Sequence, residues 1–183
     1  MSTRSVVARV EGDGFVGRYC HWDGYPTNRA KQLFQAYREL GSADALIKYA
    51  IREGDSGYWS SFCPPSEGPV EADRTTPEGE AAFQNEYKTG THSNWCFEKD
   101  NEKLVESSGD DWGTEWAYVI DDKGLSVFER MYDQSLWSDS SEKESRDAFR
   151  ASVHWAYIGT YKWDSEPNWE AVENTNRMDE EVE

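Results

Sequence analysis

The sequence predicts a single α+β domain, with a mostly antiparallel sheet built from hairpins and with helices packed on one face. Two stretches, 5–20 and 114–131, alternate apolar and polar residues around a tight turn, which is the pattern of a β-hairpin. Between them, residues 27–54 carry two consecutive apolar stripes at helical spacing. A chain of 183 residues is long enough for one such domain with a hydrophobic core. Hairpins and helices in separate blocks are typical of the α+β class.

The first half of the chain carries clear start and stop signals. "SVVARVE" (5–11) and "FVGRYC" (15–20) are expected to be strands joined by the turn "GDG". Thr27 is expected to cap the first helix and Gly41 to end it, and Ser42 to cap a second helix that stops before Gly54. The apolar stripes consist of Ala30, Leu33, Phe34, Tyr37 and Leu40 in the first helix, and of Ala43, Leu46, Ile47, Ala50 and Ile51 in the second.

The second half is less regular. Residues 55–90 are rich in Gly, Pro, Ser and acidic residues, and we expect a long polar loop region there. The domain is expected to span 1–172 and to be followed by an acidic, flexible tail at 173–183. Besides the second hairpin, we expect a short strand at 93–99, a helix at 138–153 and a strand at 154–163.

The charge of the chain restricts its partners. The formal net charge is −17, from 36 acidic and 19 basic side chains. Nucleic-acid affinity depends on Lys and Arg that displace counterions from phosphates, so direct DNA or RNA binding is not expected, and neither is docking to anionic lipid. The binding partners that the charge still allows are a neutral small molecule, a ligand held in a local basic pocket, or a basic protein. The charge is also compatible with a role in solubility alone.

Cysteine usage and hydropathy indicate a compartment. Cys20, Cys63 and Cys96 are odd in number and lack the CxxC spacing of metal sites, which favours a reducing interior over a disulfide scaffold. The opening "MSTRSVVARV" has no long apolar core for export, and no stretch approaches membrane-spanning length. We therefore expect a cytoplasmic protein without contact to a membrane.

The stretch "GRYCHWDGYP" (17–26) concentrates reactive and aromatic side chains. Cys20, His21 and Asp23 are the weak candidates for a small hydrolase-type enzyme with a cysteine nucleophile. Adjacent residues on a strand point to opposite faces, however, so Cys20 and His21 are partners only if the strand has already ended. The alternative interpretation is a structural turn, in which Asp23–Gly24 turns the chain and aromatic side chains anchor it.

No established catalytic or cofactor motif occurs elsewhere. The sequence contains no GxGxxG, GxxxxGK[ST], GxSxG or HExxH, and no HxH or HxxxH spacing. The pairs Asp110–Asp111 and Asp121–Asp122 stand beside glycines, where turn residues are the usual role. No metal and no cofactor is expected.

The segments "MSTRS" and "YCHWDGYP", together with the helix that follows, carry a resemblance to a family. The chain resembles small uncharacterised proteins of bacteriophages and mobile elements over roughly residues 1–55, including "LIKYAIREGD" (46–55), which is similar to an "LI.LGD"-type segment of those proteins. Beyond Gly57 the similarity is loose. The resemblance implies a phage-type accessory gene and an α+β fold, and it implies no activity.

These observations predict a non-enzymatic accessory protein that binds a target in the host cytoplasm. The target would be a host protein, such as a basic nucleic-acid-handling enzyme serving defence, inhibited by an acidic surface that imitates nucleic acid. The first alternative is a nucleotide-signal binder that stacks a base on Trp22 or Tyr25 and meets phosphate with Arg18, Arg29 or Lys31. The second alternative is the enzyme described above, and the oligomeric state is left open. The expected contact residues are Arg18, His21, Trp22, Asp23, Tyr25, Tyr58 and Trp59.

Overall fold

The computed structural model describes residues 3–12, 14–51, 59, 61–67, 95–98, 103–106, 114–132 and 153–175. The expected helix at 138–153 and most of the expected loop at 55–90 lie outside these residues, apart from Val153, Trp59 and the segment 61–67.

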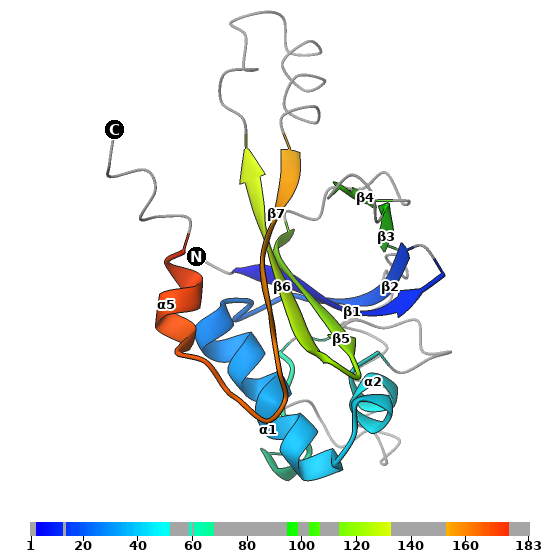
Figure 1. The fold of residues 1–183 in the computed structure, drawn as a ribbon, viewed down its shortest axis with the longest axis vertical. Coiled ribbons are helices and arrows are strands. Elements are labelled where there is room, and N and C mark those ends of the chain that lie inside the picture. Colours follow the sequence, from blue (N-terminus) through cyan, green and yellow to red (C-terminus); the bar gives the residue numbers. More distant parts are fainter. Residues whose placement is uncertain are drawn as a thin grey trace, which may run out of the picture.

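A five-stranded sheet in the order β2-β1-β5-β6-β7 forms the centre of the molecule (Figure 1). Both predicted hairpins are present, since β1 pairs with β2 and β5 pairs with β6, each antiparallel. The last strand, β7, pairs antiparallel with β6. The strands are β1 (Arg4–Glu11), β2 (Gly14–Cys20), β5 (Thr114–Asp121), β6 (Gly124–Tyr132) and β7 (Val153–Tyr161). The α+β class with a mostly antiparallel sheet is confirmed.

The two hairpins are joined through a parallel pair, β1 with β5, which the hairpin patterns did not predict. Parallel neighbours need a long crossover connection, and the chain between β1 and β5 supplies β2 and the helices. The pairing places the N-terminal strand β1 in the interior of the sheet, where Val6 and Val7 are fully buried.

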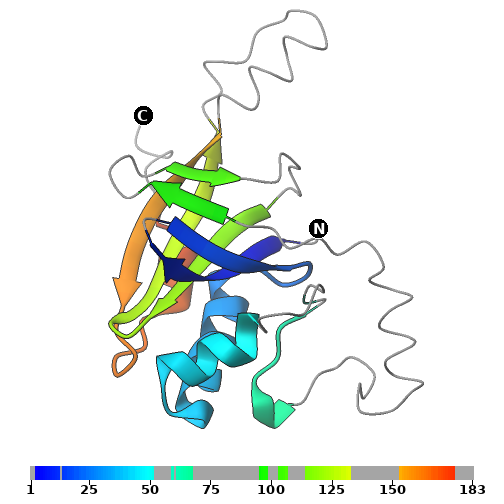
Figure 2. The ribbon, with the colours of Figure 1, turned by 90° about the vertical axis from the view of Figure 1, so that its right-hand side faces the viewer.

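The helices cover one face of the sheet, as expected (Figure 2). They are a short π-helical segment η1 (Pro26–Ala30), α1 (Lys31–Leu40) and α2 (Ala43–Ile51), together with α5 (Trp169–Glu173) and the short 3-10 turn η2 (Pro65–Glu67). Both predicted apolar stripes face the main core, with Leu33, Phe34 and Leu46 fully buried there. Gly41 ends α1 in the left-handed conformation at φ 80°, as its position predicts.

The predicted cap at Thr27 is wrong. The N-cap position is Tyr25, two residues earlier, and no side chain caps the helical segment that follows it. Instead, the Thr27 backbone N–H and hydroxyl donate to Glu173 Oε2 of α5 at 3.3 and 2.7 Å. A carboxylate from a distant element thus takes the place of the local cap, and the macrodipole favours a negative charge there. The cap expected at Ser42 is present, since its Oγ accepts from the Ala45 N–H at 3.2 Å.

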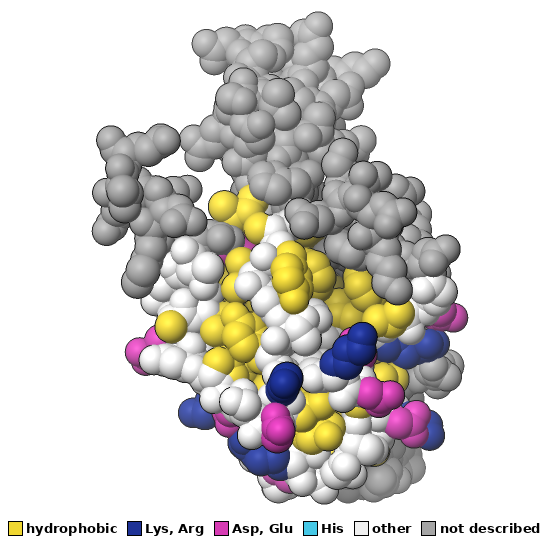
Figure 3. Space-filling model, viewed as in Figure 1, with side chains coloured by type: hydrophobic (Ala, Val, Ile, Leu, Met, Phe, Trp, Pro, Cys, Tyr) yellow, Lys and Arg dark blue, Asp and Glu magenta, His cyan; other side chains and the backbone are white. Residues whose placement is uncertain are grey.

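The opposite face of the sheet carries a second, smaller apolar cluster. Val6, Ala8, Ala117, Val119, Phe128 and Trp155 form it, with Phe15 packed against them. The two-stranded sheet of β3 (Trp95–Glu98) and β4 (Lys103–Glu106) lies on this side (Figure 2). The strand expected at 93–99 is therefore present, and its partner β4 was not predicted. Hydrophobic side chains also gather at the surface over β6 and β7 (Figure 3), where Tyr157 is 49% exposed.

The chain after β7 returns to the helical layer. The predicted strand ends at Tyr161, and Trp163 turns inward to stack on Tyr37 of α1, with ring centroids 4.3 Å apart. Helix α5 was not predicted. Its Trp169 packs edge-to-face on Phe34 at 5.2 Å, so these late residues complete the core under α1.

Candidate functional site

The segment His21–Tyr25, here called the 21–25 turn, links the end of β2 to η1. Backbone hydrogen bonds anchor its start and its middle. The His21 N–H donates to Trp59 O at 2.9 Å, and the Gly24 N–H donates to Thr3 O at 2.9 Å. The Trp59 N–H in turn donates to Tyr19 O at 2.9 Å, so Trp59 extends the edge of β2 beside Cys20.

Two buried side chains hold the carbonyls of the same turn. The Tyr118 hydroxyl donates to Gly24 O at 2.6 Å. Arg29 donates from Nη2 to Trp22 O at 2.6 Å, and from Nη1 to Phe62 O and Gln32 Oε1 at 3.1 Å each. Arg29 is fully buried, and no carboxylate in the described part of the chain pairs with it. The guanidinium charge is therefore stabilised by uncharged oxygen acceptors. Because these include both Trp22 O and Phe62 O, Arg29 links the turn to the segment that contains Phe62.

The turn has a demanding backbone. Asp23 adopts φ 57°, a left-handed conformation that Asp and Asn tolerate better than most side chains. At Gly24, a Cβ would lie 2.9 Å from both Arg4 C and Ser5 Cβ, so only glycine lets the turn pack onto β1. The pair Asp23–Gly24 thus turns the chain as the structural interpretation of this stretch predicted.

The structure separates the candidate catalytic residues. Cys20 is fully buried in the helix-side core, and its Sγ lies 3.8 Å from Arg18 O. The His21 side chain does not enter that core. Its Nδ1 lies 3.1 Å from the Tyr19 hydroxyl, and its ring packs edge-to-face on Trp22 with centroids 4.6 Å apart. The strand continues through Cys20, so adjacent residues point to opposite faces, as the strand geometry requires. Asp23 is exposed.

The expected contact residues divide into enclosed and exposed ones. Trp59, expected as a contact residue, is 2% exposed and donates its indole N–H to Ala50 O at 2.6 Å, so it belongs to the core. Arg18 is 4% exposed, donates to Ile51 O at 3.1 Å and lies 5.8 Å above the Trp59 ring. Local sequence did not indicate that these two side chains are enclosed, because Trp59 is remote from β2 in the chain and yet bridges to Cys20 and lies under Arg18.

Trp22 is 46% exposed, Asp23 is exposed and Tyr25 is half-buried. Tyr58 lies outside the described residues. Of the three cations expected to meet a phosphate, Arg18 and Arg29 are enclosed, and Lys31 alone is exposed.

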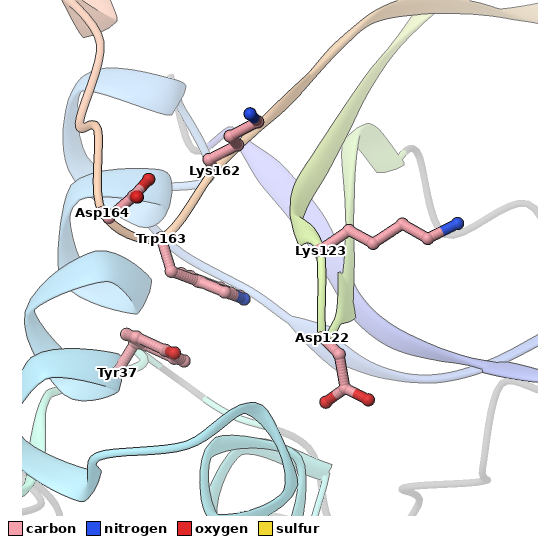
Figure 4. Close-up of a pocket in the computed structure, with 6 residues that line it drawn as sticks. All are labelled: Tyr37, Asp122, Lys123, Lys162, Trp163 and Asp164. Atoms are coloured by element: carbon pink, nitrogen blue, oxygen red, sulfur yellow. The ribbon is translucent and has the colours of Figure 1, made fainter.

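A second feature, which the sequence did not indicate, is a depression of about 330 Å³ between the β5–β6 turn and the chain after β7 (Figure 4). Tyr37, Asp122, Lys123, Lys162, Trp163 and Asp164 line it. The indole N–H of Trp163 is engaged by Asp121 O at 2.8 Å. In Figure 4 the charged ends of Lys123 and Lys162 point away from the ring pair rather than into the depression. Asp121 itself serves the turn, because its Oδ1 accepts from the N–H groups of Lys123 and Gly124.

In the described part of the chain, no group of three or more His, Cys, Asp or Glu side chains has the arrangement of a metal site. None of the helices described is long and apolar enough to cross a membrane.

Fold and site together define an α+β protein with a mixed five-stranded sheet, one helical layer and a fixed, partly exposed turn at the end of β2. In comparisons with known proteins, no family model, no curated protein and no solved structure matches the chain.

His21 is expected to make stability depend on pH. Burial, aided by the charge of Arg4, lowers the pKa of His21 below its ordinary value of 6.5. The unfolded chain then binds a proton more readily than the folded one, so the free energy of unfolding declines as pH falls below about 6.5 and stops declining below the folded pKa. Urea unfolding at pH 7.5, 6.5 and 5.5 should show this decline reduced in His21→Gln. If the unfolding free energies of the parent and the variant fall in parallel with pH, His21 is not the group that causes the decline.

Proposed function

We propose that this protein is a non-enzymatic accessory protein of a phage or mobile element that binds a basic host protein in the bacterial cytoplasm. A nucleic-acid-handling enzyme of host defence is the target class we favour, with the acidic chain acting as a competitor of nucleic acid. The single observation that carries the proposal is the net charge of −17. A field of that sign attracts a basic groove and repels nucleic acid itself. The resemblance of residues 1–55 supports the phage origin.

The charge is unevenly distributed along the chain. The described residues contain 15 acidic and 11 basic side chains, a net charge of −4, so −13 of the total −17 belongs to the remaining segments. Unpaired charge accelerates encounter and disfavours wrong partners, but it contributes less to affinity than shaped contacts do. We infer that attraction comes mainly from the acidic segments, and that the nearly charge-balanced described residues supply contacts of defined shape.

The roles of the reactive side chains also support binding rather than catalysis. Cys20 lies in the core, and Arg18 and Arg29 donate to backbone carbonyls. These groups stabilise the fold around the 21–25 turn, and the turn itself presents Trp22 and Asp23 to solvent. Exposed aromatic side chains, tryptophan above all, are enriched in protein interfaces and among the residues that contribute most to binding.

The experiment is affinity capture at increasing salt. The immobilised full chain is exposed to bacterial lysate at 50, 150 and 500 mM NaCl, with an unrelated protein of equal net charge as the control. We expect a basic protein to be enriched over the control at the two lower concentrations and to be released at 500 mM, because screening weakens attraction between charges. The purified captured protein should then bind the purified chain with an affinity that falls with salt. Equal recovery on the control protein, or no recovery at 50 mM, would refute the proposal.

A further inference from the structure

The 21–25 turn combines an exposed indole with an unusually complete set of backbone anchors. Trp22 is 46% exposed, which makes it one of the few large hydrophobic side chains at the surface of the described part. A large aromatic side chain left in water forgoes the free energy of burial, which a partner that covers the ring would recover.

The turn is fixed on every side. The His21 N–H, the Trp22 carbonyl and both backbone groups of Gly24 are hydrogen-bonded to the rest of the protein. The Asp23 carbonyl accepts from the Asn28 side chain at 3.3 Å. The buried side chains of Arg29 and Tyr118 thus hold the backbone of the turn, while the side chains of Trp22 and Asp23 on the same turn are exposed to solvent. Such a turn loses little conformational entropy when a partner binds, which is the advantage of preorganisation.

The exposed side chains of Trp22 and Asp23 are available to form further interactions. No hydrogen bond or ion pair involves the Asp23 carboxylate or the Trp22 indole N–H within the described residues. The His21 ring contacts Trp22 edge-to-face at 4.6 Å and an interplanar angle of 85°, which limits the rotation of the indole. Trp22 and Asp23 are consecutive and exposed, so one turn offers both an aromatic face, which attracts a cation, and a carboxylate, which pairs with one.

We propose that the 21–25 turn is the docking point for an arginine side chain of the basic partner, with the guanidinium on the Trp22 indole and paired to the Asp23 carboxylate. Arginine fits this pair better than lysine does, because its planar group stacks on aromatic rings and donates two parallel hydrogen bonds to a carboxylate. The positive charge of Arg29 behind the turn is directed at three oxygen acceptors and is enclosed. The inference rests on the proposed function, because it names the group of the basic partner that the turn receives.

The test measures binding of octa-arginine and octa-lysine peptides to the full chain by calorimetry at 150 mM NaCl. The variants are Trp22→Ala and Asp23→Asn, since Asn also tolerates the left-handed backbone. The matched controls are Tyr157→Ala, which removes a side chain that is 49% exposed, and Asp122→Asn, which removes one exposed carboxylate from another turn. Circular dichroism confirms that each variant is folded.

We expect octa-arginine to bind more tightly than octa-lysine, and Trp22→Ala to weaken octa-arginine binding about tenfold. Asp23→Asn should weaken it several-fold, and both controls by less than about twofold. Equal effects of Trp22→Ala and Tyr157→Ala, or no preference for arginine, would overturn the docking point and leave only attraction by net charge. If octa-arginine does not bind while a basic host protein is captured, this inference fails and the proposed function stands. If neither binds, the proposed function fails as well.

Discussion

An Arg29→Met variant is expected to lose about 3 kcal/mol of unfolding free energy, because one buried and one partly buried carbonyl lose their donor and an unsatisfied buried acceptor costs roughly 1–3 kcal/mol. The two acceptors are Trp22 O and Phe62 O, at 2.6 and 3.1 Å from the guanidinium. Methionine fills a similar volume and removes the cost of burying a charge, so the loss is smaller than the sum of the broken hydrogen bonds. Thermal unfolding should shift down by roughly 10 °C.

The control for this variant is Arg38→Met. Arg38 forms an exposed ion pair with Glu166 at 2.6 Å, so its removal should cost less than about 1 kcal/mol. Arg29→Lys keeps the charge but cannot reach all the acceptors of the guanidinium, so it should remain close to Arg29→Met in stability. Arg29→Met and Arg38→Met of equal stability would show that the buried guanidinium does not hold the turn.

A Phe34→Ala variant is expected to lose about 3–5 kcal/mol, the usual cost of removing a fully buried aromatic side chain from a core. Phe34 is 0% exposed, and its ring meets Trp163 at 5.0 Å and Trp169 at 5.2 Å. Both tryptophans belong to the chain after β7, so the substitution weakens the packing between α1 and that segment, where the stack of Tyr37 on Trp163 remains. Urea unfolding followed by tryptophan fluorescence measures the effect.

The matched control for Phe34→Ala is Tyr157→Ala, which removes a half-exposed ring from β7. Tyr157 contacts Phe128 at 5.4 Å, and we expect a loss of about 1 kcal/mol or less. If both variants unfold at the same urea concentration, the segment around Trp163 and Trp169 contributes nothing to the stability of the helical layer.

Local patterns in the sequence were sufficient for most of the secondary structure. The alternation in 114–131 and the apolar stripe that includes Leu33 and Phe34 identified β5, β6 and α1, because side-chain direction follows backbone period within one element. Residues without such a period were missed. Helix α5 has only five residues, Trp169–Glu173, and a stretch that short does not display a helical period.

The candidate site was predicted in position but not in detail. The stretch "CHWDGYP" was interpreted either as a reactive site or as a turn between strand and helix, and the structure has an anchored turn at residues 21–25. The sequence could not show that Arg18 and Arg29 are buried, because a guanidinium is enclosed only when distant carbonyls accept its hydrogen bonds. Those acceptors, at Ile51 and Phe62, lie 33 residues away in each case.

The sequence by itself determined the fold class, the two hairpins, the helical stripes and the sign of the net charge. These properties depend on residues that are neighbours in the chain, or on a sum over the whole chain. Only the tertiary structure decided that β1 pairs with β5, that Trp59 is enclosed and that Trp22 is presented to solvent. Burial and pairing depend on which remote segments meet, and no local pattern encodes that choice.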